Sequence, residues 1–166
     1  MRSVLISIQP RWCEHIATGA KTIELRKTRP TCEPPFKCFI YETKDKAYEG
    51  LSYCYASGKC FEHAVGKVIG EFTCDDIDEV AVFNDILYCV KNSQADKLKQ
   101  MRLNIHQVKE YLGRKNLGYT WHISNLVIYD KPRDLSEFYM HRKGAGTSTV
   151  IANPPQSWCY AEASEG

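Results

Sequence analysis

Lys21, Glu24, Arg26 and Lys27 bring three cations and one carboxylate into a stretch of seven residues. Arginine offers a planar fork of donors to a phosphate, and lysine offers a compact positive charge. The carboxylate of Glu24 repels phosphate, so a purely electrostatic groove for a polyanion would not include it. Glu24 can instead accept a hydrogen bond from the exocyclic amine of a base, hold Lys21 in place, or act as a general base. A surface ion pair and a ligand site are both open interpretations of this cluster.

A predicted strand and a predicted helix precede the cluster. Residues 4–8 alternate with the period of two residues that is typical of a half-buried strand. Pro10 is typical of the first position of a helix, and Gly19 is typical of the position just after one. We therefore expect a short helix that is followed directly by a second strand.

The segment KTIELRK, residues 21–27, predicts that second strand. Its apolar residues Ile23 and Leu25 face one side, whereas Glu24 and Arg26 face the other. This alternation predicts that the charged side chains lie near a cleft beside the helix.

The rest of the chain predicts many strands and few helices. We expect a long loop over residues 44–66 and a bulge near Gly70. Asn104 and Gln107 have the spacing of a capping box, which separates two short helices. Further strands are expected at residues 36–43, 66–83, 118–132 and 154–162, and helices at residues 93–101 and 104–112. This order favours an α+β fold, a small mixed β-barrel with a few short helices, in a single domain over residues 1–166.

The charges are unevenly distributed along the chain, although the net charge is only +2. Residues 71–90 carry six acidic and no basic side chains, and residues 91–116 carry seven basic against two acidic ones. This segregation predicts distinct charged faces. No apolar run approaches the roughly 20 residues that a membrane span needs, and no signal-peptide pattern opens the sequence. We therefore expect a cytoplasmic protein without a membrane partner.

The eight cysteines are interpreted as reduced thiols, because the chain is long for a disulfide scaffold and lacks an export signal. Cys54, Cys60 and His63 offer three metal ligands from one segment. The paired spacing of a structural zinc site is absent, so we expect neither a metal nor another cofactor.

Flat side chains accompany the basic ones, as recognition of unstacked bases requires. Trp12, Trp121 and Trp158 are the candidates, and packing inside the barrel is the alternative for at least two of them. Trp121 shares its strand face with Ile123, which favours the core. His122 lies on the opposite face and is a site candidate, with a histidine bonded to the backbone as the alternative.

Three motifs resemble those of ASCH domains, a branch of the PUA-like superfamily. The segment LISIQPRWCEHIATGAKTIELRK resembles their opening, and GYTWHIS with KPRDLSEF resembles their late strand and the following turn. The segment PPQSWCYAE resembles the closing strand of an ASCH-like group that is common in phages and their bacterial hosts. The resemblance implies a PUA-like β-barrel with a cleft between the first helix and the mouth of the barrel.

The resemblance also implies a function that involves nucleic acids. The family is regarded as RNA-binding, or as acting on components of nucleic acids. Some members resemble small amidohydrolases that remove the acyl group of N4-acetylcytidine. Lys21 matches their lysine, whereas Glu24 stands where they have a threonine.

We therefore expect RNA or a nucleotide-like small molecule to bind in this cleft. The alternative is a small hydrolase that acts on an acylated nucleobase or on RNA, with Lys21 and Glu24 as the catalytic residues. A third interpretation is a phage-related interaction protein that uses an apolar patch. Whether the chain is an enzyme is left open. The expected binding residues are Gln9, Lys21, Glu24, Arg26, Lys27, His122, Gln156 and Ser157.

Overall fold

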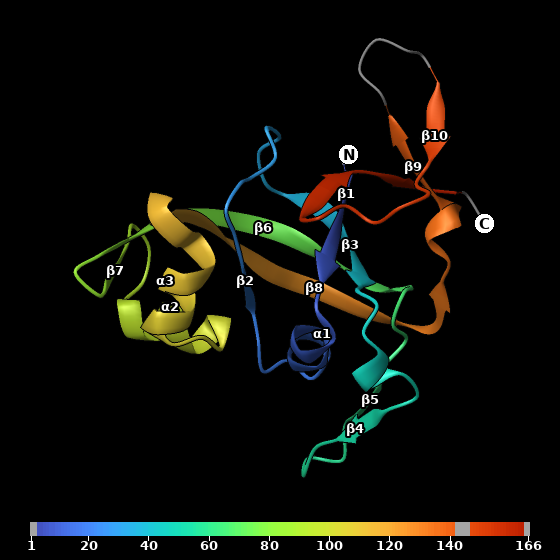
Figure 1. Ribbon diagram of the computed structural model, residues 1–166, viewed down its shortest axis with the longest axis horizontal. Helices are drawn as coiled ribbons and strands as arrows, with labels where there is room; N and C mark the ends of the chain where they lie inside the picture. Colours follow the sequence, from blue (N-terminus) through green and yellow to red (C-terminus); the bar gives the residue numbers. More distant parts are fainter. Residues whose placement is uncertain (1–2, 142–146, 165–166) are drawn as a thin grey trace.

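The computed structural model describes residues 3–141 and 147–164 (Figure 1). The strands are β1 (Ser3–Ile8), β2 (Ile23–Arg26), β3 (Phe36–Glu42), β4 (Ser52–Cys54), β5 (Cys60–Glu62), β6 (Val68–Phe83), β7 (Ile86–Cys89), β8 (Leu117–Arg133), β9 (Phe138–His141), β10 (Ser148–Val150), β11 (Trp158–Tyr160) and β12 (Glu162–Ala163). The helices are α1 (Pro10–Ala17), α2 (Gln94–Met101) and α3 (Ile105–Leu112), with 3-10 turns η1 (Lys46–Tyr48), η2 (Gly113–Lys115) and η3 (Leu135–Glu137).

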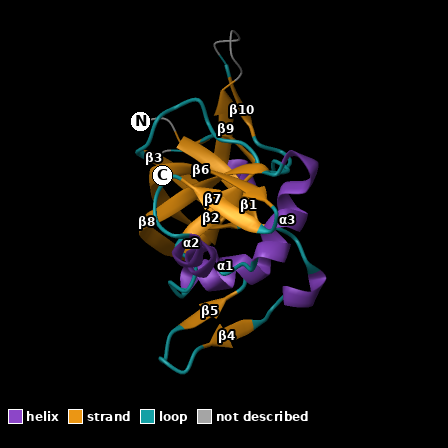
Figure 2. Ribbon diagram, turned by 90° about the vertical axis from the view of Figure 1, so that its left-hand side faces the viewer, coloured by secondary structure: helices purple, strands orange, loops and turns teal. Residues whose placement is uncertain are grey.

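One large curled sheet organises the molecule, and its strands follow the order β11-β1-β3-β6-β8-β2, with β7 paired to β6. The pair β1–β3 is parallel and the other pairs of this sheet are antiparallel. The long strands β6 and β8 run side by side across the molecule (Figures 1 and 2). The predicted α+β class and the small mixed β-barrel are thus confirmed.

A bulge in β6 helps the sheet to curl. The register of β6 shifts between Val68 and Gly70 against β8, and a further shift occurs at Ile40 of β3. A Cβ atom at Gly70 would lie only 2.4 Å from the carbonyl oxygen of Val127, so the close approach of the two strands requires glycine here. The predicted bulge near Gly70 is confirmed.

The two faces of β2 meet different surroundings. Ile23 and Leu25 face outward and pack against the apolar side of α2 and α3, which includes Met101 and Val108. Glu24 pairs in register with Trp121 of β8, a fully buried residue of the main core, so Glu24 and Arg26 face the inside of the barrel. The amphipathic pattern of residues 21–27 therefore aims the charges at the mouth of the barrel.

The segregated charges of residues 71–116 neutralise each other. Lys97 of α2 and Asp78 of β6 form an ion pair of 3.2 Å, with 3% of each side chain exposed. Lys109 pairs with Asp85 at 2.7 Å, and Lys91 pairs with Asp76. The Lys97–Asp78 pair thus holds α2 against β6, and these three lysines are not available to a separate basic face.

The helices were predicted well, and the segment from 44 to 66 was not. Asn104 and Gln107 form the predicted capping box at the start of α3. The expected long loop instead contains η1 and the hairpin of β4 and β5, which projects away from the large sheet (Figure 1). No helix among the described residues is long and apolar enough to cross a membrane.

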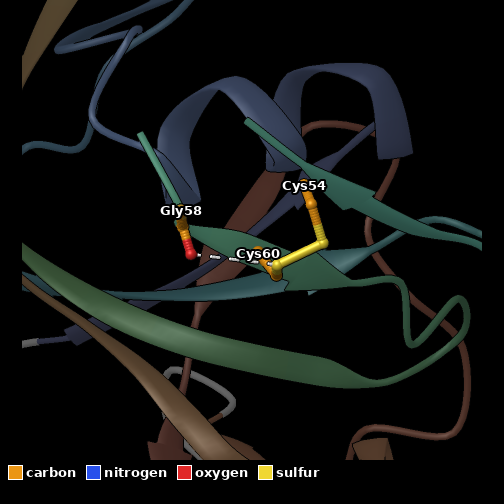
Figure 3. Close-up of a disulfide and its surroundings, with 3 residues drawn as sticks. All are labelled: Cys54, Gly58 and Cys60. Carbon is orange, nitrogen blue, oxygen red and sulfur yellow. Dashed lines mark hydrogen bonds between the residues drawn. A yellow bond between two sulfur atoms is a disulfide. The ribbon is translucent and has the colours of Figure 1, made fainter. Parts of the chain in front are cut away.

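The hairpin carries the disulfide Cys54–Cys60, so the prediction of reduced thiols was wrong for this pair. The two cysteines face each other directly in the register of β4 and β5, and the disulfide links these strands (Figure 3). Sequence spacing alone does not reveal this register, because the five intervening residues fit a loop as well as a turn. The other cysteines of the described chain are free thiols.

Candidate ligand cleft

A cavity of about 1060 Å³ opens at the mouth of the barrel. Its walls come from the start of α1, from β2 and the residues after it, from α3, and from the segment before β11. The predicted site residues that line this cavity are Gln9, Lys21, Glu24, Arg26, Lys27, Gln156 and Ser157. Segments far apart in the sequence therefore meet at one cleft.

A buried group of three charges lies at the floor of the cleft. Oε2 of Glu24 is 3.3 Å from Nζ of Lys21, and Oε1 of Glu24 is 3.1 Å from Nη2 of Arg26. Less than a tenth of each of these three side chains is exposed. One carboxylate thus serves two cations in a site that is largely withdrawn from water, where charges interact more strongly than at a surface.

The main chain fixes both cations. Nζ of Lys21 donates to the carbonyl oxygen of Met101 at the end of α2, over 2.7 Å. Nη2 of Arg26 donates to the carbonyl oxygen of Ser7 over 2.6 Å, and Nη1 donates to Oγ of Ser157 over 3.4 Å. Each cation is therefore anchored to a main-chain carbonyl oxygen as well as paired with Glu24.

Two polar atoms of this floor have no hydrogen-bond partner within the described chain: Oε2 of Glu24 and Nε of Arg26. Oε2 is within ion-pair distance of Lys21 but is not aligned for a hydrogen bond. Buried polar atoms are usually paired, so unpaired ones often mark a functional site. A small movement of either side chain would offer a ligand one acceptor and one donor.

Burial changes the acid–base character of the cleft. Desolvation lowers the pKa of Lys21 below its ordinary value, although the neighbouring Glu24 opposes this shift. Burial likewise raises the pKa of Tyr111 in the wall that α3 forms. Lys21 therefore gives up its proton more readily than a surface lysine, and Tyr111 keeps its proton more firmly than a surface tyrosine.

Aromatic rings with cations beside them flank the cleft. Nζ of Lys21 lies 5.2 Å from the ring centre of Trp12, and the guanidinium carbon of Arg11 lies 4.8 Å from it. Nζ of Lys27 lies 5.4 Å from the ring centre of Tyr111. These distances are those of cation–π contacts. Trp12 and Tyr111 both line the cavity, whereas Trp121 is core, as predicted.

His122 does not line the cleft in the described part of the chain. The register of β2 and β8 pairs His122 with Ile23, which places it on the outer face of the sheet, opposite Glu24. There its Nδ1 lies 2.6 Å from Oδ1 of Asp75. The pattern of residues 118–124 predicted the face of His122 correctly, but it could not show which face of the sheet encloses the cleft.

Sequence reasoning missed the contribution of α3, which supplies Gln107, Glu110 and Tyr111 to the cleft. The spacing of these residues, i, i+3 and i+4, places them on one helical face. This spacing is visible in the sequence, and the opposite face of α3 packs in the core through Val108 and Leu112. No group of three or more histidine, cysteine, aspartate or glutamate residues suited to a metal occurs among the residues described.

Solved structures with the same fold identify the architecture. The crystal structure of ASCH from Zymomonas mobilis is similar to this chain with a TM-score of 0.61 and 19% identity, over 95% of this chain and 86% of that one. One mutant of ZmASCH has a TM-score of 0.59 and 17% identity, over 96% of this chain and 90% of that one. Another mutant of ZmASCH has a TM-score of 0.62 and 18% identity, over 95% of this chain and 87% of that one.

No protein-family model and no curated protein sequence matches the chain. The expected cytoplasmic location and the relation to phage proteins stay predictions. The three similarities each cover 95% or 96% of this chain. The chain therefore has the fold of these ASCH structures, a small mixed β-barrel with a few short helices.

Proposed function

We propose that the chain binds RNA or a nucleotide-like ligand in the cleft between α1, β2 and α3. The observation that carries this proposal is the buried group Lys21–Glu24–Arg26 at the floor of a large cavity that Trp12 and Tyr111 flank. A volume of about 1060 Å³ lies at the upper end of small-molecule sites, which measure about 300–1,000 Å³, so there is room for a base with its sugar and phosphate.

The cleft offers different chemistry at its floor and at its rim. Glu24 partly neutralises the charges of Lys21 and Arg26, and each cation also bonds a main-chain carbonyl oxygen, so the floor suits a neutral polar group such as the edge of a base. Lys27 and Arg11 are exposed and lie beside the two flanking rings. We therefore assign the phosphates to the rim, and the base to the space between the rim and the floor.

A salt-titrated binding assay with short single-stranded RNA and DNA tests the proposal. The wild type is expected to bind RNA, with an affinity that falls as salt rises, because bound phosphates release counterions. The variant Arg11→Ala/Lys27→Ala loses two rim cations, so the slope of log affinity against log salt should become shallower by about 1.4.

The matched control is Lys115→Ala/Lys131→Ala, which removes two exposed cations that neither line the cleft nor make the cation–π contacts by which Arg11 and Lys27 adjoin Trp12 and Tyr111. Its slope should equal that of the wild type. Absence of RNA binding, or an equal effect of the two double variants, would refute the placement of the phosphates at this rim.

A second candidate function, hydrolysis of an acylated nucleobase, is favoured by one observation. Lys21 has a lowered pKa and lies 3.3 Å from Glu24, so the pair can exchange a proton with a water molecule or a leaving group. Release of acetate from N4-acetylcytidine, measured by chromatography, tests this activity. The variants Lys21→Met and Glu24→Gln should abolish it, and a rate equal to that of the wild type in either variant would exclude the pair as the catalytic group.

A further inference from the structure

A second buried cluster lies outside the cleft and joins three parts of the chain. Nδ1 of His63 is 2.6 Å from Oε1 of Glu42 at the end of β3, and Nε2 of His63 is 3.1 Å from Oε2 of Glu14 on α1. The side chains of His63 and Glu42 are 1% and 0% exposed, and that of Glu14 is 15% exposed. One imidazole thus sits between two carboxylates in a largely buried site.

The number of protons decides whether this arrangement holds. A neutral imidazole carries one N–H and can donate to only one carboxylate, whereas the imidazolium donates to both. The other oxygen of Glu42 already accepts the amide N–H of Ala64 over 2.7 Å, so that side chain cannot turn away without losing a bond. Burial also raises the pKa of Glu42, which favours retention of a proton within the cluster. The geometry of one imidazole between two carboxylates and the raised pKa of Glu42 together favour a proton held within the folded cluster.

The other groups that face the cluster do not supply an alternative charge. The rings of Tyr48 and Phe61 stand edgewise to His63, each with its centre 4.9 Å away. The hydroxyl of Tyr55 lies 3.5 Å from the carboxylate and from the carbonyl oxygen of Glu14. Burial raises the pKa of Tyr55, and it also raises the pKa of Cys13, which interacts with Glu42. Both therefore stay neutral through the range in which a histidine titrates.

The cluster connects the hairpin to the cleft through α1. The hairpin of β4 and β5 lies beside α1 (Figures 1 and 2). At the base of the hairpin, the amide N–H of His63 donates to the carbonyl oxygen of Leu51. Helix α1 carries Trp12 into the cleft, and Thr43, which follows Glu42, lines the same cavity. We propose that Glu14, His63 and Glu42 form a proton-dependent clasp, which holds the segment 48–63 on α1. The clasp thereby positions α1 at the cleft. Only the effect of the clasp on ligand binding rests on the proposed function.

The variant Glu14→Gln provides a sharp test, because it should make the clasp independent of pH. The amide of a glutamine at position 14 can donate to the unprotonated Nε2 of a neutral His63, while Nδ1–H still donates to Glu42. Amide hydrogen exchange of residues 51–63 and of α1 is measured from about pH 6 to about pH 9, with each rate divided by its intrinsic rate. In the wild type the protection should fall with rising pH, by up to about tenfold per pH unit once the proton is lost. In Glu14→Gln the protection should stay constant.

Further variants complete the design. His63→Phe keeps a flat ring without any side-chain donor and should lose protection at every pH, and nitrogen chemical shifts of the wild-type His63 report its protonation independently of exchange. Wild-type protection that persists while the nitrogen shifts of His63 and the carboxyl carbon shift of Glu42 show that the cluster has lost its proton would overturn the clasp. RNA affinity measured over the same range should decline with rising pH in the wild type and not in Glu14→Gln. If neither protein binds RNA, the proposed function fails, and the exchange data still decide on the clasp.

Discussion

Arg26 joins the two ends of the curled sheet, since its Nη2 lies 2.6 Å from the carbonyl oxygen of Ser7. Arg26 belongs to β2, the last strand in the sheet order, and Ser7 belongs to β1, next to the opposite end. Among the strand pairings of the described residues, none joins β2 to β1 or to β11. A second side-chain bond, from Nε1 of Trp158 to Oγ1 of Thr28, crosses the same gap. The barrel is thus closed at this seam by side chains, and the cleft lies along the seam.

We expect Arg26→Met to lower the free energy of unfolding by about 3–5 kcal/mol, because it leaves the buried carboxylate of Glu24 with one cation fewer. Urea unfolding at neutral pH measures this loss. The control is Lys109→Met, which breaks an ion pair whose two side chains are more than half exposed and should cost about 1 kcal/mol or less. Equal losses in the two variants would show that Arg26 behaves as a surface cation and does not close the barrel.

Substitution of Trp12 should weaken RNA binding, whereas substitution of Trp121 should lower the stability of the fold. Trp12→Ala removes a ring that lines the cleft, so it should weaken RNA binding by about 1–3 kcal/mol, the usual worth of one stacked base. Trp121→Ala removes a side chain with no exposed surface from the main core and should cost about 3–5 kcal/mol of stability. Binding by fluorescence anisotropy and unfolding by urea distinguish the two effects. A Trp12 variant with full affinity would argue against stacking at this wall.

Glu71 should give the protein an acid-sensitive contribution to stability. Desolvation alone would raise the pKa of this carboxyl group, but hydrogen bonds from Lys37 and Tyr129 lower it below its ordinary value. A lowered folded-state pKa contributes stability that is fully present above the unfolded pKa of about 4.3 and is lost as the pH falls through the folded pKa. Stability measured from pH 7 down to strongly acid solution should therefore decline less in Glu71→Gln than in the wild type. A parallel decline in the two proteins would contradict this assignment.

Reduction of the Cys54–Cys60 disulfide should loosen only the tip of its hairpin. An isolated two-stranded hairpin is marginally stable, so the tip depends on the cross-link. In Cys54→Ser, the amides of Tyr55 and Gly58, which bond within the turn, should exchange faster. The cleft should keep its RNA affinity, since none of the lining residues belongs to the tip. Lost affinity in this variant would mean that the hairpin tip contributes to binding.

The sequence predicted best those elements in which a local pattern and the tertiary structure agree. The alternation in residues 21–27 placed Glu24 and Arg26 on one face of β2, and packing of Ile23 and Leu25 against α2 and α3 leaves the charged face to the cleft. The capping box of α3 depends on contacts three residues apart, which a sequence displays directly.

The prediction failed where distant segments decide. His122 was assigned to the correct face of β8, but only the pairing with Ile23 shows that this face lies outside the barrel. The segregation of charge over residues 71–116 predicted distinct charged faces, yet Lys97 is buried against Asp78, 19 positions earlier in the chain. The clasp at His63 unites residues from α1, β3 and the end of the hairpin, and no spacing in the sequence indicates such a meeting.

The seam at Arg26 also determines how the aperture of the cleft is set. Strands that share a backbone ladder are held about 4.8 Å apart whatever their side chains are. Across the seam, the separation instead follows from the reach of side chains, which are the guanidinium group of Arg26 and the indole of Trp158. The choice of residue at position 26 therefore tunes the aperture, while the hydrogen-bond ladders of the sheet remain unchanged.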